Sequence, residues 1–184
     1  MKKQENNSFV HSTACLYGEY VLEPKVSVWP FVVMRAEDHY IQISEGTNIQ
    51  DGTIIHVGFR HPVNIGKNCT IGHRVLIHGA TIGNDCVIGS GTMILDGAVV
   101  ENGCVIEAGS IIREGEIVRN TAGDKTLDQT IKNRFLSLMY YENAKAYTEG
   151  NHRLWSESEF KQEQRQVLMQ MMKDAKNQKS ESES

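Results

Sequence analysis

An aliphatic residue recurs nearly every six positions in this chain, from Val10 to Val118. Glycine often follows it, as in "IGKNCT", "IGHRVL" and "IGNDCV", and a small or β-branched residue usually comes four positions later. A unit this short cannot bury its own apolar side chain, so successive units must stack on one another. The repeat therefore predicts an all-β solenoid, a parallel β-helix whose coils share one continuous core over residues 10–118.

The interruptions of the repeat predict its cross-section. Three aliphatic positions per coil make six coils from the following residues: Val10, Leu16, Leu22, Val28, Met34, Ile43, Ile49, Ile55, Ile65, Ile71, Ile77, Ile82, Ile88, Ile94, Val100, Ile106, Ile112 and Val118. The intervals from Met34 to Ile43 and from Ile55 to Ile65 contain extra residues. These two insertions lie three aliphatic positions apart, so we expect both to leave the same corner of a three-sided coil.

The segments outside the repeat differ in character. Residues 1–9 are expected to form a polar N-terminal tail, and residues 119–150 a connector followed by a helix that packs along the solenoid. This helix is indicated by the helical spacing of Leu127, Ile131, Phe135, Leu138 and Met139. Thr126 or Asp124 is its expected cap, and Gly150 its expected end.

Residues 151–184 are predicted to form a C-terminal extension. A second helix is expected at about 158–176, because Phe160, Val167, Leu168 and Met171 fall on one face. The tail "KNQKSESES" has a composition typical of disorder.

Composition excludes some partners and locations. The net charge is −4 and no basic patch stands out, which argues against nucleic acid. We expect no signal peptide, because the first residues "MKKQENNSFV" contain no apolar segment, and no membrane partner, because no apolar run reaches membrane-spanning length. The four cysteines form no CxxC pair, which favours a cytoplasmic protein with reduced thiols. Cys69, Cys86 and Cys104 are expected to stack inside the solenoid, and Cys15 to face outward.

Four of the seven histidines lie in "IIHVGFRHPVNIGKNCTIGHRVLIHG", residues 54–79. His56 and His78 each follow an aliphatic position by one, three such positions apart, and Arg35 holds the same slot one coil earlier. Adjacent parallel strands lie ~4.8 Å apart. Arg35, His56 and His78 are therefore predicted to form one column beside the enlarged corner.

His73 belongs to another side of the solenoid. Asp51 holds the same slot one coil below it, with Gln50 adjacent, so these residues form a second predicted column. One ion with bonds near 2 Å cannot bridge a full side. His73 and His78 do share one coil, so a rotation axis parallel to the solenoid could bring His73 of a neighbouring copy to His56 and His78, and three sides suit a homotrimer. Three histidines with one open position are typical of catalytic zinc; the alternative is a set of outward polar residues without a ligand.

The motifs "VSVWPFVVMRAE", "ISEGTNIQDGTIIH" and "IGHRVLIHGATIGNDCVIG" resemble the γ-class carbonic anhydrases and their relatives among the hexapeptide-repeat proteins. The resemblance implies a left-handed β-helix. It also implies that His56 and His78 of one subunit and His73 of its neighbour bind zinc, or alternatively iron or cobalt.

The resemblance also assigns roles to other residues. Gln50 matches a glutamine that orients the metal-bound water or bicarbonate, Arg35 and Asp51 match a pair across the subunit interface, and Tyr140 matches a helix tyrosine that reaches the site. Where the family has Arg-Gly-Asp, this chain has Arg35-Ala36-Glu37, which makes Glu37 a candidate catalytic carboxylate. The loop "VGFRHPVN" lacks the acidic proton shuttle of well-studied members; His61 is either a shuttle or a solvated loop residue.

These observations lead to one leading expectation and two alternatives. The leading function is weak reversible hydration of carbon dioxide to bicarbonate by a metal-bound hydroxide at a subunit interface. The second is an acyl- or thioester-processing enzyme that uses coenzyme A and a histidine base. The third is a non-catalytic trimeric scaffold held together by the metal.

Overall fold

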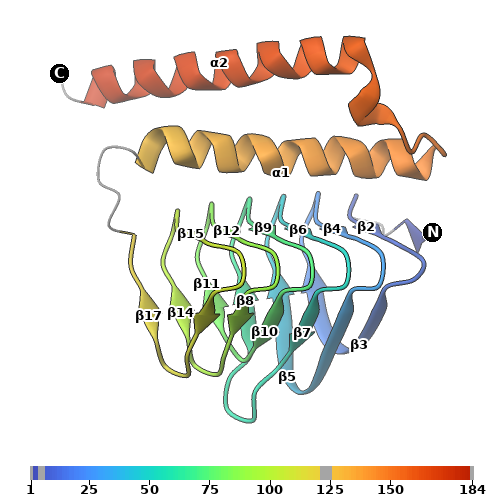
Figure 1. The fold of residues 1–184 in the computed structure, drawn as a ribbon, viewed down its shortest axis with the longest axis vertical. Coiled ribbons are helices and arrows are strands. Elements are labelled where there is room, and N and C mark those ends of the chain that lie inside the picture. Colours follow the sequence, from blue (N-terminus) through green and yellow to red (C-terminus); the bar gives the residue numbers. More distant parts are fainter. Residues whose placement is uncertain (1, 4–6, 121–125, 183–184) are drawn as a thin grey trace.

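A computed structural model describes residues 2–3, 7–120 and 126–182. The chain forms a parallel β-solenoid of about six turns followed by C-terminal helices (Figure 1). The predicted fold is confirmed, while the left-handed winding stays an expectation from the resemblance. No helix in the described part of the chain is long and apolar enough to cross a membrane.

Three stacks of short strands form the sides of the solenoid. The first side contains β2 (Phe9–Val10), β4 (Ser27–Val28), β6 (Asn48–Ile49), β9 (Thr70–Ile71), β12 (Val87–Ile88) and β15 (Val105–Ile106). The second contains β3 (Cys15–Leu22), β5 (Val33–Ile43), β7 (Ile54–His56), β10 (Leu76–His78), β13 (Met93–Ile94) and β16 (Ile111–Ile112). The third contains the far ends of β3 and β5 with β8 (Val63–Ile65), β11 (Thr81–Ile82), β14 (Val99–Val100) and β17 (Ile117–Val118).

The aliphatic positions pair in the predicted register. Val28 pairs with Ile49, and Ile49 with Ile71, so each side stacks every third position of the repeat. Nearly all of these side chains are buried and form one core cluster along the solenoid. The six-residue period thus sets both the coil and its core.

The enlarged corner lies where the two insertions predict it. Strands β3 and β5 pair up to Gly18 with Ala36 and resume at Glu19 with Tyr40, so residues 37–39 leave the sheet. On the next coil, β5 pairs with β7 up to Arg35 and His56, and with β8 from Ile41 and Val63. Residues 57–62 therefore form a loop at the same corner.

Helix α1 (Thr126–Thr148) lies along the solenoid, where it contacts β2, β4, β6 and β9 (Figure 1). Arg134 donates two hydrogen bonds to the Asp85 carboxylate, from Nε at 2.7 Å and from Nη2 at 2.9 Å. Asn133 Nδ2 donates to the Asp85 carbonyl at 2.7 Å, and the Ser137 hydroxyl donates to the carbonyl of Gly46. These bonds fix the helix to the coils that contain β6 and β12, which lie on either side of the coil that contains β9.

The helix bounds agree with most of the sequence expectations. Helix α1 begins at Thr126. The capping by Thr126 or Asp124 stays a prediction, because Asp124 and the side chains of Thr126 and Leu127 lie outside the described residues. Gly150 follows the helix with φ +84°, a conformation that glycine adopts without steric cost. Ile131 is buried, as the helical spacing predicts.

Two expectations about the flanking segments are wrong. Phe9, assigned to a polar tail, is buried against Trp29 and Ala144, and β1 (Lys2–Lys3) pairs antiparallel with β2. Helix α2 (Ser158–Ser182) continues past Lys176 through most of the tail expected to be disordered, because Lys, Gln and Glu favour helix and no Gly or Pro interrupts it. Residues 183–184 lie outside the described residues.

The interior cysteines lie where their spacing places them. Cys69, Cys86 and Cys104 are buried, and Cys15 is exposed. Thiols of one coil donate to carbonyls of the next, from Cys69 to Gly83 at 3.0 Å and from Cys86 to Glu101 at 3.1 Å. Burial raises the pKa of the Cys104 thiol to about 11, and burial also raises the pKa of the Cys69 thiol well above its usual value. These thiols are core side chains.

Candidate metal centre

Two histidines stack on adjacent coils. His56 at the end of β7 pairs with His78 at the end of β10, and their ring centroids lie 4.9 Å apart. Both follow a fully buried isoleucine by one residue, so the alternation of the strand turns both imidazoles outward. The β-solenoid therefore presents two imidazoles side by side at the enlarged corner.

Arg35 and Glu37 complete this group, called here the histidine cluster (Arg35, Glu37, His56 and His78). Arg35 Nη1 donates to Glu37 Oε1 at 2.6 Å. His56 Nε2 lies 3.2 Å from Glu37 Oε2 and 3.3 Å from Arg35 Nη2. The insertion at residues 37–39 thus places the Glu37 carboxylate next to His56.

Asp96 is a further member that sequence reasoning missed. Its Oδ1 accepts a hydrogen bond from His78 Nδ1 at 2.9 Å. A Cβ added at Gly58 or Gly79 would collide with the same carboxylate oxygen, so two glycines make room for it. When Nδ1 of a histidine donates to a carboxylate, Nε2 is left as the atom that can bind an ion.

A second group lies on the first side of the solenoid, called here the glutamine cluster (Gln50, Asp51, His73 and Tyr140). His73 Nδ1 lies 3.2 Å from Asp51 Oδ2, which is the contact expected from their shared slot. Gln50 is buried and its Nε2 donates to Asn48 Oδ1 at 3.1 Å.

Tyr140 of α1 joins the glutamine cluster from above. Burial raises the pKa of its hydroxyl, the negative charge of Asp51 raises it further, and a hydrogen bond between Tyr140 and Gln50 opposes both effects. The structure therefore places Tyr140 beside Gln50 and Asp51.

Neither cluster alone completes a metal site. Among the described residues of one chain, no three His, Cys, Asp or Glu side chains converge to hold an ion. Arg35 and Asp51, expected to pair between subunits, contact Glu37 and His73 respectively within the chain. His61 is exposed in the corner loop, where its backbone forms a turn with Gly58. One copy thus supplies two imidazoles at one place and the third at another.

The donor set still fits a divalent metal ion. His56 and His78 present neighbouring imidazoles, and Asp96 fixes the proton of one of them. Imidazole nitrogens are ligands for zinc, iron and cobalt. His73 is half exposed at 52%, so its ring is accessible to a neighbouring molecule.

The resemblance of this chain to known hexapeptide-repeat proteins is confirmed by comparison. Residues 79–114 match the family described as bacterial transferase hexapeptide (six repeats). The chain is 36% identical over 94 residues to protein YrdA of Escherichia coli, which covers 47% of this chain and 51% of that protein. It is 35% identical over 98 residues to the mitochondrial gamma carbonic anhydrase 1 of Arabidopsis thaliana, which covers 50% and 36%. The chain thus spans about half or less of the length of the curated relatives it matches.

A solved structure gives the longer match. The crystal structure of a hexapeptide transferase family protein from Anaplasma phagocytophilum superimposes with a TM-score of 0.64 at 29% identity. The match covers 76% of this chain and 92% of that one. The fold and the repeat therefore resemble those of hexapeptide-repeat β-solenoid proteins, and gamma carbonic anhydrases are among the relatives.

Proposed function

We propose that this protein is a γ-carbonic anhydrase-like metalloenzyme that converts carbon dioxide and water reversibly to bicarbonate. The observation that carries the proposal is the in-register stack of His56 on His78, with Asp96 on Nδ1 of the latter. His73 of a neighbouring copy is the third proposed ligand. A divalent zinc, iron or cobalt ion held by three imidazoles lowers the pKa of its bound water and so supplies a nucleophile at neutral pH.

The side chains around the histidines have proposed roles in this reaction. Asp96 holds the proton on His78 Nδ1. Arg35 pairs with Asp51 of a neighbouring copy, which releases His56 Nε2 from its present contact with Arg35. Gln50 and Tyr140 of that copy orient the oxygen atoms of carbon dioxide and bicarbonate.

Proton transfer is the proposed weak step. The corner loop at residues 57–62 carries no acidic residue, and Glu37, 3.2 Å from His56 and about half exposed, is the carboxylate positioned to pass the proton to solvent. We propose that Glu37 and the buffer in solution together carry the proton away from the site. Turnover should therefore be slow and should depend on the buffer concentration.

A homotrimer is supported by an apolar row beside the histidine column. Val33, Ile54, Leu76, Met93 and Ile111 pair in register, each one residue before a buried position. Ile54, Met93 and Ile111 are 45%, 38% and 53% exposed. Aligned exposed apolar side chains mark surfaces that associate, and a neighbour placed here would cover the histidine cluster.

A reducing, cytoplasmic location stays part of the proposal.

The test combines metal content with activity. Protein purified without added metal is expected to contain about one ion per chain, and the loaded protein to hydrate carbon dioxide weakly, with a rise in rate on addition of imidazole buffer. His78→Ala should lose both metal and activity, whereas His11→Ala, on the first side of the solenoid, should keep both. Full metal content in His78→Ala would contradict the proposed site.

The same measurements distinguish the alternatives. Hydrolysis or transfer from an acyl-coenzyme A by metal-free protein would identify the acyl-processing enzyme, which the hexapeptide transferase family neighbour favours. Bound metal with carbon dioxide hydration at the protein-free rate would identify the scaffold.

A further inference from the structure

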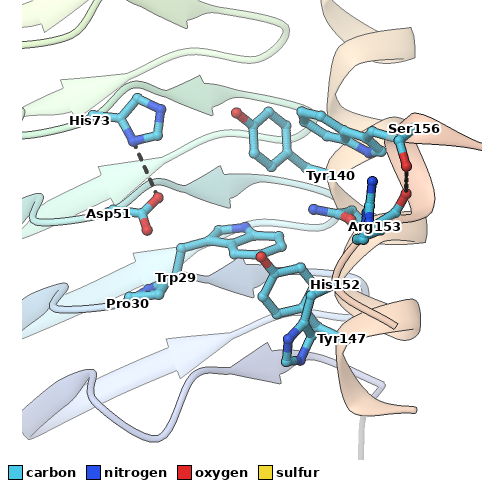
Figure 2. A pocket seen from close by; sticks show the side chains of 11 residues that line it. Trp29, Pro30, Asp51, His73, Tyr140, Tyr147, His152, Arg153 and Ser156 are labelled. Carbon is cyan, nitrogen blue, oxygen red and sulfur yellow. Dashed lines mark hydrogen bonds and ion pairs between the residues drawn. The ribbon is translucent and has the colours of Figure 1, made fainter. Parts of the chain in front are cut away.

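A pocket of about 470 Å³ lies between the first side of the solenoid, the end of α1 and the short helix η2 (Leu154–Ser156). Its walls are aromatic. Trp29 of the solenoid meets Tyr140 at 5.8 Å and Tyr147 at 5.1 Å between ring centroids, and Trp155 meets Tyr140 at 5.1 Å. All three pairs meet edge to face. Figure 2 shows Trp29 and Tyr140 between Asp51 and Arg153.

The two ends of this pocket differ in charge. Asp51 and His73 form its inner end and contact each other at 3.2 Å. Arg153 and His152 lie on the other side of the aromatic rings (Figure 2). Among the described residues, no carboxylate forms an ion pair with the Arg153 guanidinium, although its backbone nitrogen and carbonyl are bonded. The outer end therefore offers a cation without an anionic partner.

We propose that this pocket binds a small organic carboxylate with a flat, apolar body. The Arg153 guanidinium matches a carboxylate through paired N–H donors. Trp29, Tyr147 and Trp155 present the apolar surface and ring edges that suit a flat group. The volume falls within the range of small-molecule sites, roughly 300–1,000 Å³, and exceeds what carbon dioxide requires.

The orientation of the bound molecule follows from the charges. The Arg153 guanidinium attracts the carboxylate of the ligand, and the apolar body points inward among the aromatic rings. The Tyr140 hydroxyl is protonated at neutral pH, since its pKa is raised, and it adds no negative charge. His152 stacks on Tyr147 at 4.5 Å and closes the rim beside Arg153.

This proposal does not depend on bound metal or on carbon dioxide hydration. Trp29, Tyr147, Arg153 and Trp155 have no role in the proposed metal site. Binding can therefore be measured on protein treated with a chelator, and its failure leaves the proposed function untouched.

The chain itself provides the reporter, because Trp29 and Trp155 are its two tryptophans and both line the pocket. Titration of the full-length, chelator-treated protein with benzoate should change tryptophan fluorescence saturably. Benzamide has the same shape without the charge and should bind about tenfold more weakly, the effect of losing one charge-assisted contact. Higher salt should weaken benzoate binding and leave benzamide binding unchanged.

Variants locate the binding. Arg153→Gln should reduce the affinity for benzoate to that for benzamide without altering the latter, and Arg165→Gln on the exposed face of α2 should alter neither. Trp155→Ala, at a residue 39% exposed, should weaken binding of both ligands, measured by calorimetry, at an unchanged melting temperature. Equal binding of benzoate and benzamide, full benzoate affinity in Arg153→Gln, or no saturable change would each overturn the proposal.

Discussion

At the scale of single residues, Asp96 decides which nitrogen of His78 faces outward. It accepts from Nδ1, and the glycines at 58 and 79 leave the space that its carboxylate occupies. Histidine ligands in metal sites commonly depend on such a partner for ring orientation. Asp96 is therefore expected to control metal affinity without touching the ion.

We predict that Asp96→Ala lowers zinc affinity about 10- to 100-fold, because the His78 ring loses its fixed tautomer and orientation. Competition with a chelator of known affinity measures the effect. Asp96→Asn, whose amide oxygen can still accept from Nδ1, should lose less. Glu114→Ala, in the same slot on the next coil, is the matched control, and an equal loss in that variant would show a general effect of surface charge.

The repeat predicts His56 over His78 because both follow an aliphatic position by one. It does not predict Asp96, which follows Ile94 by two and reaches His78 diagonally from the next coil. The signal that could have found it is the glycine that follows His78, since Gly79 holds the same slot one coil below and leaves that slot open. Counting positions along the repeat therefore predicts which residues stack directly on one another. Contacts between different positions on adjacent coils depend on the directions of the side chains, which the repeat does not give.

At the scale of elements, two neighbouring residues of α1 bind Asp85 of the solenoid in different ways, one through a buried amide and one through a half-exposed guanidinium. Asn133 is 2% exposed and bonds the Asp85 carbonyl, whereas the Arg134 side chain is 52% exposed beside the Asp85 carboxylate. Solvent screens the ion pair but not the amide. The neutral residue is therefore expected to matter more for docking the helix.

We predict that Asn133→Ala lowers the free energy of unfolding by about 1–3 kcal/mol, because it leaves the Asp85 carbonyl without this donor. Arg134→Ala should cost about 1 kcal/mol or less. Urea denaturation at constant slope measures both, with Lys132→Ala on the exposed face of the same helix as the control. A larger loss in Arg134→Ala than in Asn133→Ala would reverse the assigned order.

The sequence predicted the positions of the two helices, but not the aromatic contacts between α1, η2 and the solenoid. Periodic apolar residues located α1 and α2, because one apolar face suffices to define a helix. The aromatic group of Phe9, Trp29, Tyr140, Tyr147 and Trp155 combines three distant segments of the chain. No local pattern connects those segments, so the pocket could be found only in the folded molecule.

At the scale of the whole molecule, the proposed site is divided between two places on each copy. The histidine cluster and the glutamine cluster lie on different sides of the solenoid, and each is incomplete alone. In the proposed homotrimer, each histidine cluster would meet the glutamine cluster of a neighbour. The division makes the assembly testable by exchange of subunits.

We predict that His56→Ala and His73→Ala trimers each lose metal at every site, and that unfolding and refolding the two variants together restores it in part. In random equal mixtures, a site is complete when an intact His56 meets an intact His73, which gives about a quarter of wild-type metal. His56→Ala mixed with His78→Ala is the control and should restore nothing, because both residues belong to the same cluster. No recovery in verified mixed trimers would contradict the shared site.

At the corner formed by residues 37–39 and 57–62, the chain can change in length without a change in the register of the coils. Pairing stops before each insertion and resumes in register beyond it, so added residues need not shift any strand. Lengthening such a loop twofold costs roughly 0.6 kcal/mol of closure entropy. This corner borders the paired histidines, so loop segments beside the proposed metal site can change in length and sequence while the solenoid beneath keeps its register.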